Sequence, residues 1–227
     1  MSAPTTALVI GASGGLGGAL AAHLEGRGCA VHRLSRSVDG LYITDEASVA
    51  AAADRLRDRC EFPDWILVTT GALTVDGTQP ERAFRFLEPA VMARSFAVNA
   101  IGPALLFKHF APLLPRSRPS VFAALSARLA SVGDNHLGGW ISYRASKSAL
   151  NQVLRCGSIE LGRRWPHAVV VGLHPGTVET ALTVPYARGR YTASPAEAAA
   201  QLVGVLEGLG PKDSGGLFAY DGQPIPW

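Results

Sequence analysis

Cysteine is scarce in this 227-residue chain, which contains only Cys29, Cys60 and Cys156. The three are odd in number, scattered, and set at no spacing typical of a metal site. A disulfide framework and a bound metal are therefore not expected. Such use of cysteine is typical of a reducing cytoplasm, where we expect the protein to act.

Charge and long apolar runs are scarce as well. Only 17% of the residues are charged, the formal net charge is +3, and no run of Lys and Arg stands out, so nucleic acid is not an expected partner. Residues 7–10 are apolar but lack the basic flank and cleavage site of a signal peptide. No uninterrupted apolar stretch approaches the ~18 residues of a membrane span. What is abundant is hydrophobic residues, at 48%, enough for a large core.

Short apolar runs alternate with longer helical patterns along the whole chain. Most of the runs are continuous rather than alternating, as in parallel strands covered on both faces. This order predicts an α/β fold: a single Rossmann-like, doubly wound parallel sheet of about seven strands flanked by helices, forming one dinucleotide-binding domain over residues 1–227. The predicted strands are 7–10, 30–34, 41–43, 65–69, 121–125, 168–173 and 217–220. The predicted helices are 16–27, 47–59, 89–114, 140–164 and 195–208.

A glycine-rich turn, Gly-Ala-Ser-Gly-Gly-Leu-Gly at 11–17, follows the first strand directly and opens the first helix. Glycines there allow a tight turn and close approach to a pyrophosphate, which the N–H groups of the helix face. The Lys-Ser/Thr ending of a P-loop is missing, so ATP and GTP are the weaker choice. The candidate nucleotide-binding residues here are Gly11, Ser13, Gly14, Gly15, Leu16 and Gly17.

The end of the second strand bears on the choice of cofactor. An acidic residue there would bind a ribose 2′-hydroxyl, and an arginine a 2′-phosphate. After Ser35 the chain has no acid until Asp39, and it offers Arg33 and Arg36. We predict NADP(H), with NAD(H) as the alternative, and Ser35 and Arg36 as ligands. Two solvated arginines on a turn are the competing interpretation.

Tyr143 and Lys147 lie four residues apart on a predicted helix and therefore share one face. An ammonium beside a phenol favours the phenolate and is expected to lower the pKa of Tyr143 from about 10. That would suit the hydroxyl to proton transfer near neutral pH.

Taken in order, these motifs resemble the short-chain dehydrogenase/reductase family: the turn at 11–17, Asn99, a serine within 126–131, Tyr143 with Lys147, and Pro175-Gly176. Segments 99–103, 138–140, 143–147 and 221–227 resemble the C-factor/sniffer-like branch of small carbonyl reductases. The likeness spans essentially the whole chain.

The resemblance implies an oxidoreductase that transfers a hydride between a nicotinamide and a small carbonyl or alcohol. Tyr143 would be the general acid/base, Lys147 would lower its pKa and hold the nicotinamide ribose, and Asn99 would support a water chain to Lys147. A serine would bind the substrate oxygen. The resemblance also implies a homodimer or homotetramer. The remaining cofactor contacts it implies are Ile43, Gly71, Ala72, Pro175, Gly176, Val178 and Thr180.

Several positions depart from the family pattern. Strict register puts the serine at Ala127, so Ser126 and Ser131 are rival candidates and Ser126 is slightly preferred. Gly71-Ala72 replaces an Asn-containing turn, and Tyr42 replaces an Asp that contacts adenine. These departures motivate a rival hypothesis, a dinucleotide-binding regulatory or signalling protein with little turnover.

The region 181–193 corresponds to the family's substrate lid and contains two arginines and two tyrosines. It is consistent with an anionic or an aromatic carbonyl compound, or with a solvated loop. Trp140 is a pocket wall or, as is commoner, a helix-packing residue.

Overall fold

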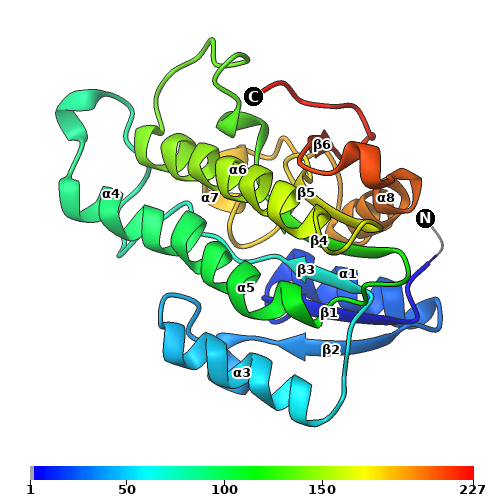
Figure 1. The fold of residues 1–227 in the computed structure, drawn as a ribbon. Helices are drawn as coiled ribbons and strands as arrows, with labels where there is room; N and C mark the ends of the chain where they lie inside the picture. The colour runs from blue at the N-terminus through cyan, green and yellow to red at the C-terminus, as the bar shows by residue number, and fades with distance from the viewer. Residues whose placement is uncertain (1–2) are drawn as a thin grey trace.

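A computed structural model describes residues 3–227 and contains one parallel sheet in the order β2-β1-β3-β4-β5-β6 (Figure 1). The strands are β1 (Thr6–Ile10), β2 (Ala30–Leu34), β3 (Trp65–Val68), β4 (Ser120–Leu125), β5 (Ala168–His174) and β6 (Leu217–Ala219). The sheet confirms the predicted doubly wound α/β fold, with six strands in the described part of the chain. The order reverses between β1 and β3, the place where such sheets bind ligands.

Helices cover both faces of the sheet (Figure 1). On one face lie α1 (Gly15–Gly26) and α8 (Pro195–Gly208). On the other lie α3 (Glu46–Asp58), α4 (Pro89–Phe96), α5 (Gly102–Phe110) and α6 (Ile141–Gly162). Two short helices, α2 (Arg36–Asp39) and α7 (Val184–Ala187), lie in connections. Short 3₁₀ turns complete the helical elements: η1 (Phe84–Phe86), η3 (Ala111–Leu113), η4 (Arg128–Ala130) and η5 (Pro211–Asp213).

The first strand shows why the apolar runs are continuous. Ala7 and Val9 pack into the core beneath α1 and α8, while Leu8 and Ile10 pack into the core on the opposite face. Successive side chains of a strand point to opposite faces, so a strand covered on both sides must be apolar at every position.

The predicted strand at 41–43 is wrong, because this segment runs as a turn. Helix α2 ends at Gly40 in the left-handed conformation (φ 66°), and the Leu41 N–H donates to the Ser35 carbonyl oxygen at 3.2 Å. A crossover to a further parallel strand needs about a dozen residues, and the chain between β2 and residue 41 is only half that length. The sheet therefore ends at β2.

One predicted helix, 89–114, forms as a continuous helical segment that contains a π turn, η2 (Ala97–Ile101), between α4 and α5. Its span Pro89–Leu113 has a mean hydropathy of 1.5, enough by length and composition to cross a membrane. In the fold, Leu106 and Phe110 of this segment are fully buried in the core on this face of the sheet.

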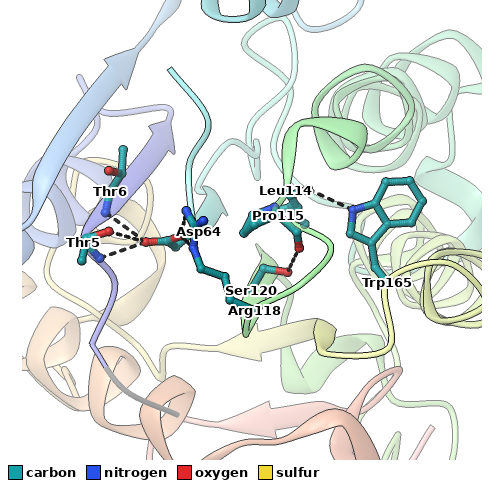
Figure 2. A network of polar contacts seen from close by, with 8 residues as sticks. All are labelled: Thr5, Thr6, Asp64, Leu114, Pro115, Arg118, Ser120 and Trp165. Atoms are coloured by element: carbon teal, nitrogen blue, oxygen red, sulfur yellow. Dashed lines mark hydrogen bonds and ion pairs between the residues drawn. The ribbon is translucent and has the colours of Figure 1, made fainter. Parts of the chain in front are cut away.

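A polar network lies at the amino edge of the sheet (Figure 2). The Asp64 carboxylate accepts hydrogen bonds from Thr5 Oγ1 at 2.7 Å and from Arg118 Nε at 2.8 Å. Nearby, the Trp165 indole donates to the Leu114 carbonyl oxygen at 2.9 Å. These contacts join the starts of β1, β3 and β4 and lie at the edge opposite the predicted site.

Candidate active site

The predicted site residues gather at the carboxyl edge of the sheet, where the loops after β1, β3, β4 and β5 meet the first half of α6. The glycine turn and the turn after β5 lie against each other. A Cβ placed on Gly15 would stand 3.0 Å from Thr180 Cγ2. Two segments 165 residues apart in the sequence thus form one wall of the site.

The glycine turn has the shape of a phosphate cradle. Gly11 has a φ of 93°, and a Cβ on Gly17 would lie only 2.3 Å from the Gly11 carbonyl oxygen. The first residue of α1 is preceded by Gly14, which offers no side-chain cap to the N–H groups that open the helix. This geometry fits a dinucleotide pyrophosphate.

At the end of β2 the structure separates the two arginines. Arg33 is held by Glu25 through two hydrogen bonds of 3.0 and 2.7 Å. Arg36 is exposed and forms no ion pair among residues 3–227. The Ser35 hydroxyl accepts from the Val38 N–H, which caps α2. Arg36 is therefore the arginine that remains available to an anion.

The nearby Ile43 packs against the π turn rather than into solvent. A Cβ on Gly102 would lie 2.9 Å from Ile43 Cδ1, so a larger residue at position 102 would displace the Ile43 side chain. Tyr42, next to it, is exposed.

Lys147 is only 3% exposed, and its Nζ donates to the Leu125 carbonyl oxygen at 2.8 Å. A Cβ on Gly71 would stand 3.3 Å from that Nζ and 3.4 Å from Asn99 Oδ1. Glycine at position 71 therefore lets the ammonium and the amide approach the same turn.

Asn99 lies in the π turn and is fully buried. Its Oδ1 accepts from the Ala72 N–H at 2.9 Å, and its Nδ2 donates to the Ala72 carbonyl oxygen at 3.0 Å. Nδ2 also lies 3.2 Å from the hydroxyls of Ser95 and Ser146. The side chain thus fixes the turn after β3 against α6.

Burial dominates the protonation of the pair on α6. It raises the pKa of Tyr143 to about 12 and lowers the pKa of Lys147 to about 8. The expected lowering of the Tyr143 pKa is therefore not found. The cause is burial, which disfavours the charged phenolate. At neutral pH the phenol is protonated and suited to donate a proton.

The position of the Ser126 hydroxyl argues against the preference for Ser126 as the catalytic serine. Ser126 Oγ donates to Asn151 Oδ1 at 2.7 Å, and Asn151 lies two helical turns beyond Tyr143 on α6. Ala127 instead packs with Tyr143 and Leu73. Adjacent extended residues point in opposite directions, so Ser126 turns its hydroxyl away from Tyr143. The Ser131 hydroxyl accepts from the Asp134 N–H within its own loop.

The turn after β5 is held from the lid region. Gly176 has a φ of 77°, and a Cβ on it would lie 3.0 Å from Thr192. Val178 is buried and forms a bridge with Ala193. Pro175 opens this turn at the carboxyl end of β5.

Two residues near Tyr143 have a role in the site that the sequence did not predict. Trp140 lies with its ring edge-to-face to Tyr143 (centroids 6.3 Å apart) and to Tyr186 (5.3 Å), so it is a wall of the site. Glu81 is buried, and its carboxylate accepts from Ser142. No local signal marks Glu81, because its partner is 61 residues away.

Comparisons with known proteins agree with this fold. Residues 5–190 match the family model of the short chain dehydrogenases, and the chain belongs to that family. It is 36% identical over 138 residues to the C-signal protein of Myxococcus xanthus, covering 61% of this chain and 80% of that protein.

Solved structures share the fold over nearly the full chain. The carbonyl reductase Sniffer of D. melanogaster superposes with a TM-score of 0.85 at 21% identity, covering 98% of this chain and 99% of that one. A short-chain dehydrogenase/reductase from Burkholderia multivorans with bound NADP gives 0.80 at 25% identity, covering 99% and 100%.

Proposed function

We propose that this protein is an NADP(H)-dependent oxidoreductase of small carbonyl or alcohol compounds, with Tyr143 as the general acid. The observation that carries the proposal is the buried Tyr143 phenol at the carboxyl edge of the sheet, one helical turn before the buried Lys147 on α6. When bound, the nicotinamide supplies the hydride for the carbonyl carbon. We further propose a cytoplasmic homo-oligomer.

The binding residues fall into three groups. The uncapped start of α1 and the glycine turn would hold the pyrophosphate. Arg36, which has no protein partner within the described residues, would bind a 2′-phosphate. The likeness to an NADP-bound relative at 25% identity supports the same cofactor.

The proton is handled by residues on α6 and the π turn. Tyr143, protonated at neutral pH because burial raises its pKa to about 12, would donate to the substrate oxygen. The Lys147 ammonium would stabilise the phenolate that remains. Asn99 hydrogen-bonds to the turn after β3, which lies beside the Lys147 ammonium. A protonated phenol is the form that donates the proton when a carbonyl is reduced.

The test is oxidation of NADPH by the purified protein with a panel of aldehydes, ketones and quinones. Replacing Tyr143 by Phe should lower turnover by about 10²–10⁴-fold, because the general acid is removed. The affinity for NADPH, read by fluorescence titration, should remain within a few-fold. Unchanged turnover in this variant would contradict the mechanism.

A second candidate is a dinucleotide-binding regulatory or signalling protein. It is favoured by Ala127, which packs with Tyr143 at the position where the family pattern has a serine, and by the likeness to the C-signal protein. A protein that binds NADPH tightly yet oxidises it with no member of the panel would support this candidate over the enzyme.

A further inference from the structure

The start of α6 is held by a residue that is remote in the sequence. Trp140, the residue before the helix, offers no side-chain cap, and the first turn of α6 contains no acid. Glu81, from the loop between β3 and α4, supplies both the side-chain cap and the acidic group. Its Oε2 accepts from the Ser142 N–H at 3.1 Å, and its Oε1 accepts from the Ser142 hydroxyl. A carboxylate at this position also suits the positive end of the helix dipole.

Backbone strain is concentrated at the same point. Gly138, Gly139 and Trp140 have φ values of 62°, 63° and 51° in succession. Two glycines adopt the left-handed region freely, but a bulky aromatic residue rarely does. Such a conformation persists only where the surroundings impose it. Here the Trp140 N–H donates to the Glu81 main-chain carbonyl oxygen at 2.5 Å.

The strained backbone determines where the indole lies. The Trp140 ring stands edge-to-face to Tyr143 and to Tyr186, and Tyr186 is in turn hydrogen-bonded to Thr74 across the site. Tyr143 packs with the apolar side chains of Leu73, Ala127 and Leu129. The adjoining pocket is also lined by polar residues: Thr78, Gln79, Glu81, Ser95 and Ser142.

Charged side chains near this wall are engaged elsewhere or face solvent. The Arg144 guanidinium donates to the carbonyl oxygens of Gly139 and Leu129. Arg128 is paired with Asp134 at 3.0 Å. In the lid, Arg188 and Arg190 are exposed, while Tyr186 is turned inward.

From this geometry we infer that Glu81 is a positioning residue that holds Trp140 in its left-handed conformation, and that Trp140 thereby selects carbonyl substrates with a flat apolar group. The inference rests on the proposed carbonyl chemistry at Tyr143 and adds to it a substrate class and its determinant. Aromatic rings in edge-to-face contact gain affinity beyond their buried area.

The activity test compares benzaldehyde with cyclohexanecarbaldehyde, which have similar size but differ in aromaticity. In Trp140→Ala the preference in kcat/KM for benzaldehyde should fall about five- to tenfold, mostly through a higher KM. Glu81→Ala should reproduce that fall, and Glu81→Gln, whose amide oxygen still accepts, should restore at least half of the preference. Glu88→Ala, an exposed glutamate of the same loop, is the matched control and should change nothing.

Two readouts need no turnover. The near-UV circular dichroism that Trp140→Phe removes should also be missing from Glu81→Ala, while the far-UV spectrum stays the same. Affinity for benzyl alcohol against cyclohexylmethanol, from isothermal titration calorimetry, should show the same loss of preference in Trp140→Ala and Glu81→Ala.

These readouts separate the two hypotheses. A wild-type protein that turns over no carbonyl contradicts the proposed function, while the dichroism and alcohol affinities still decide the inference. A Trp140→Ala protein with an unchanged aromatic preference would overturn the inference. So would a Glu81→Ala protein that keeps both the Trp140 signal and the preference.

Discussion

The two edges of the parallel sheet are built differently. At the amino edge, the buried Asp64 carboxylate is surrounded by donors from Thr5, Thr6 and Arg118, and the Trp165 indole is capped by a main-chain carbonyl (Figure 2). At the carboxyl edge, Lys147 is buried with its ammonium against one carbonyl oxygen, and the Thr70 hydroxyl has no partner among the described residues.

The amino edge therefore stabilises the fold, whereas the carboxyl edge contains buried groups that destabilise it. Polar groups at the amino edge are fully hydrogen-bonded, so they hold the strands together at little desolvation cost. At the carboxyl edge, burial disfavours the charged forms of Tyr143 and Lys147. Such shifted groups are typical of functional sites.

The largest effect is expected from replacing Lys147 by Met. Activity should fall by about 10²–10⁴-fold because the phenolate loses its stabilising charge. The free energy of unfolding should rise by about 1–3 kcal/mol at pH 7, since a buried charge is replaced by an apolar chain of similar volume. Turnover and urea unfolding measure the two changes. A variant that is both active and less stable would contradict this interpretation.

The pH dependence of stability gives the same residue a second signature. The folded-state pKa of Lys147, about 8, lies below its ordinary value of 10.5, so the unfolded chain binds more protons between these values. The Lys147 contribution to stability should therefore rise as pH increases from about 8 to 10.5, opposed above pH 9 and 10 by Cys29 and Tyr143, respectively, whose pKa values burial raises to about 11 and 12. The Lys147→Met protein should lack this rise.

At the opposite edge, replacing Asp64 by Asn should lower the free energy of unfolding by about 2–4 kcal/mol, because buried donors lose a charged acceptor. Activity per folded molecule should not change. Burial opposes ionisation of Asp64, but hydrogen bonds from Thr5 and Arg118 outweigh it and hold its pKa below the usual range. The stabilisation should thus be present at neutral pH and disappear in acid. The exposed Asp58→Asn is the control.

The Ala127→Ser variant tests whether the carboxyl edge lacks a hydroxyl donor beside Tyr143. A hydroxyl beside Tyr143 should add a donor for the substrate oxygen and raise kcat by about tenfold, below the 10²–10³ of a fully formed oxyanion donor. The matched variant Ser126→Ala should lose stability by about 1 kcal/mol through its Asn151 hydrogen bond and keep kcat. Loss of turnover in Ser126→Ala would restore Ser126 as the catalytic serine.

An effect of similar size, on cofactor affinity alone, is expected at the two arginines. Arg36→Ala should weaken NADPH binding by about tenfold and leave NADH binding unchanged, since only the former has a 2′-phosphate. Arg33→Ala should alter neither, because Glu25 already holds that guanidinium. Fluorescence titration with both cofactors measures the difference. An equal loss of affinity for the two cofactors would show that Arg36 does not bind the 2′-phosphate.

Much of the frame was predictable because it depends on neighbours in the sequence. The buried strands follow from continuous apolar runs, and the start of α8 follows from Ser194 and Glu197, which form a capping box. The glycine turn follows from residues without a Cβ. The strand expected at 41–43 did not form, because pairing depends on the length of the crossover as well as on apolar residues.

Sequence by itself determined the doubly wound fold, the glycine cradle and the shared face of Tyr143 and Lys147, since periodicity and steric freedom are local properties. Tertiary structure alone decided that Ser126 faces Asn151, that Arg33 is tied to Glu25, and that Glu81 holds the start of α6. It also decided the pKa of Tyr143, which burial raises to about 12 against the expected effect of the lysine. Burial and partners distant in the sequence are set only when the chain has folded.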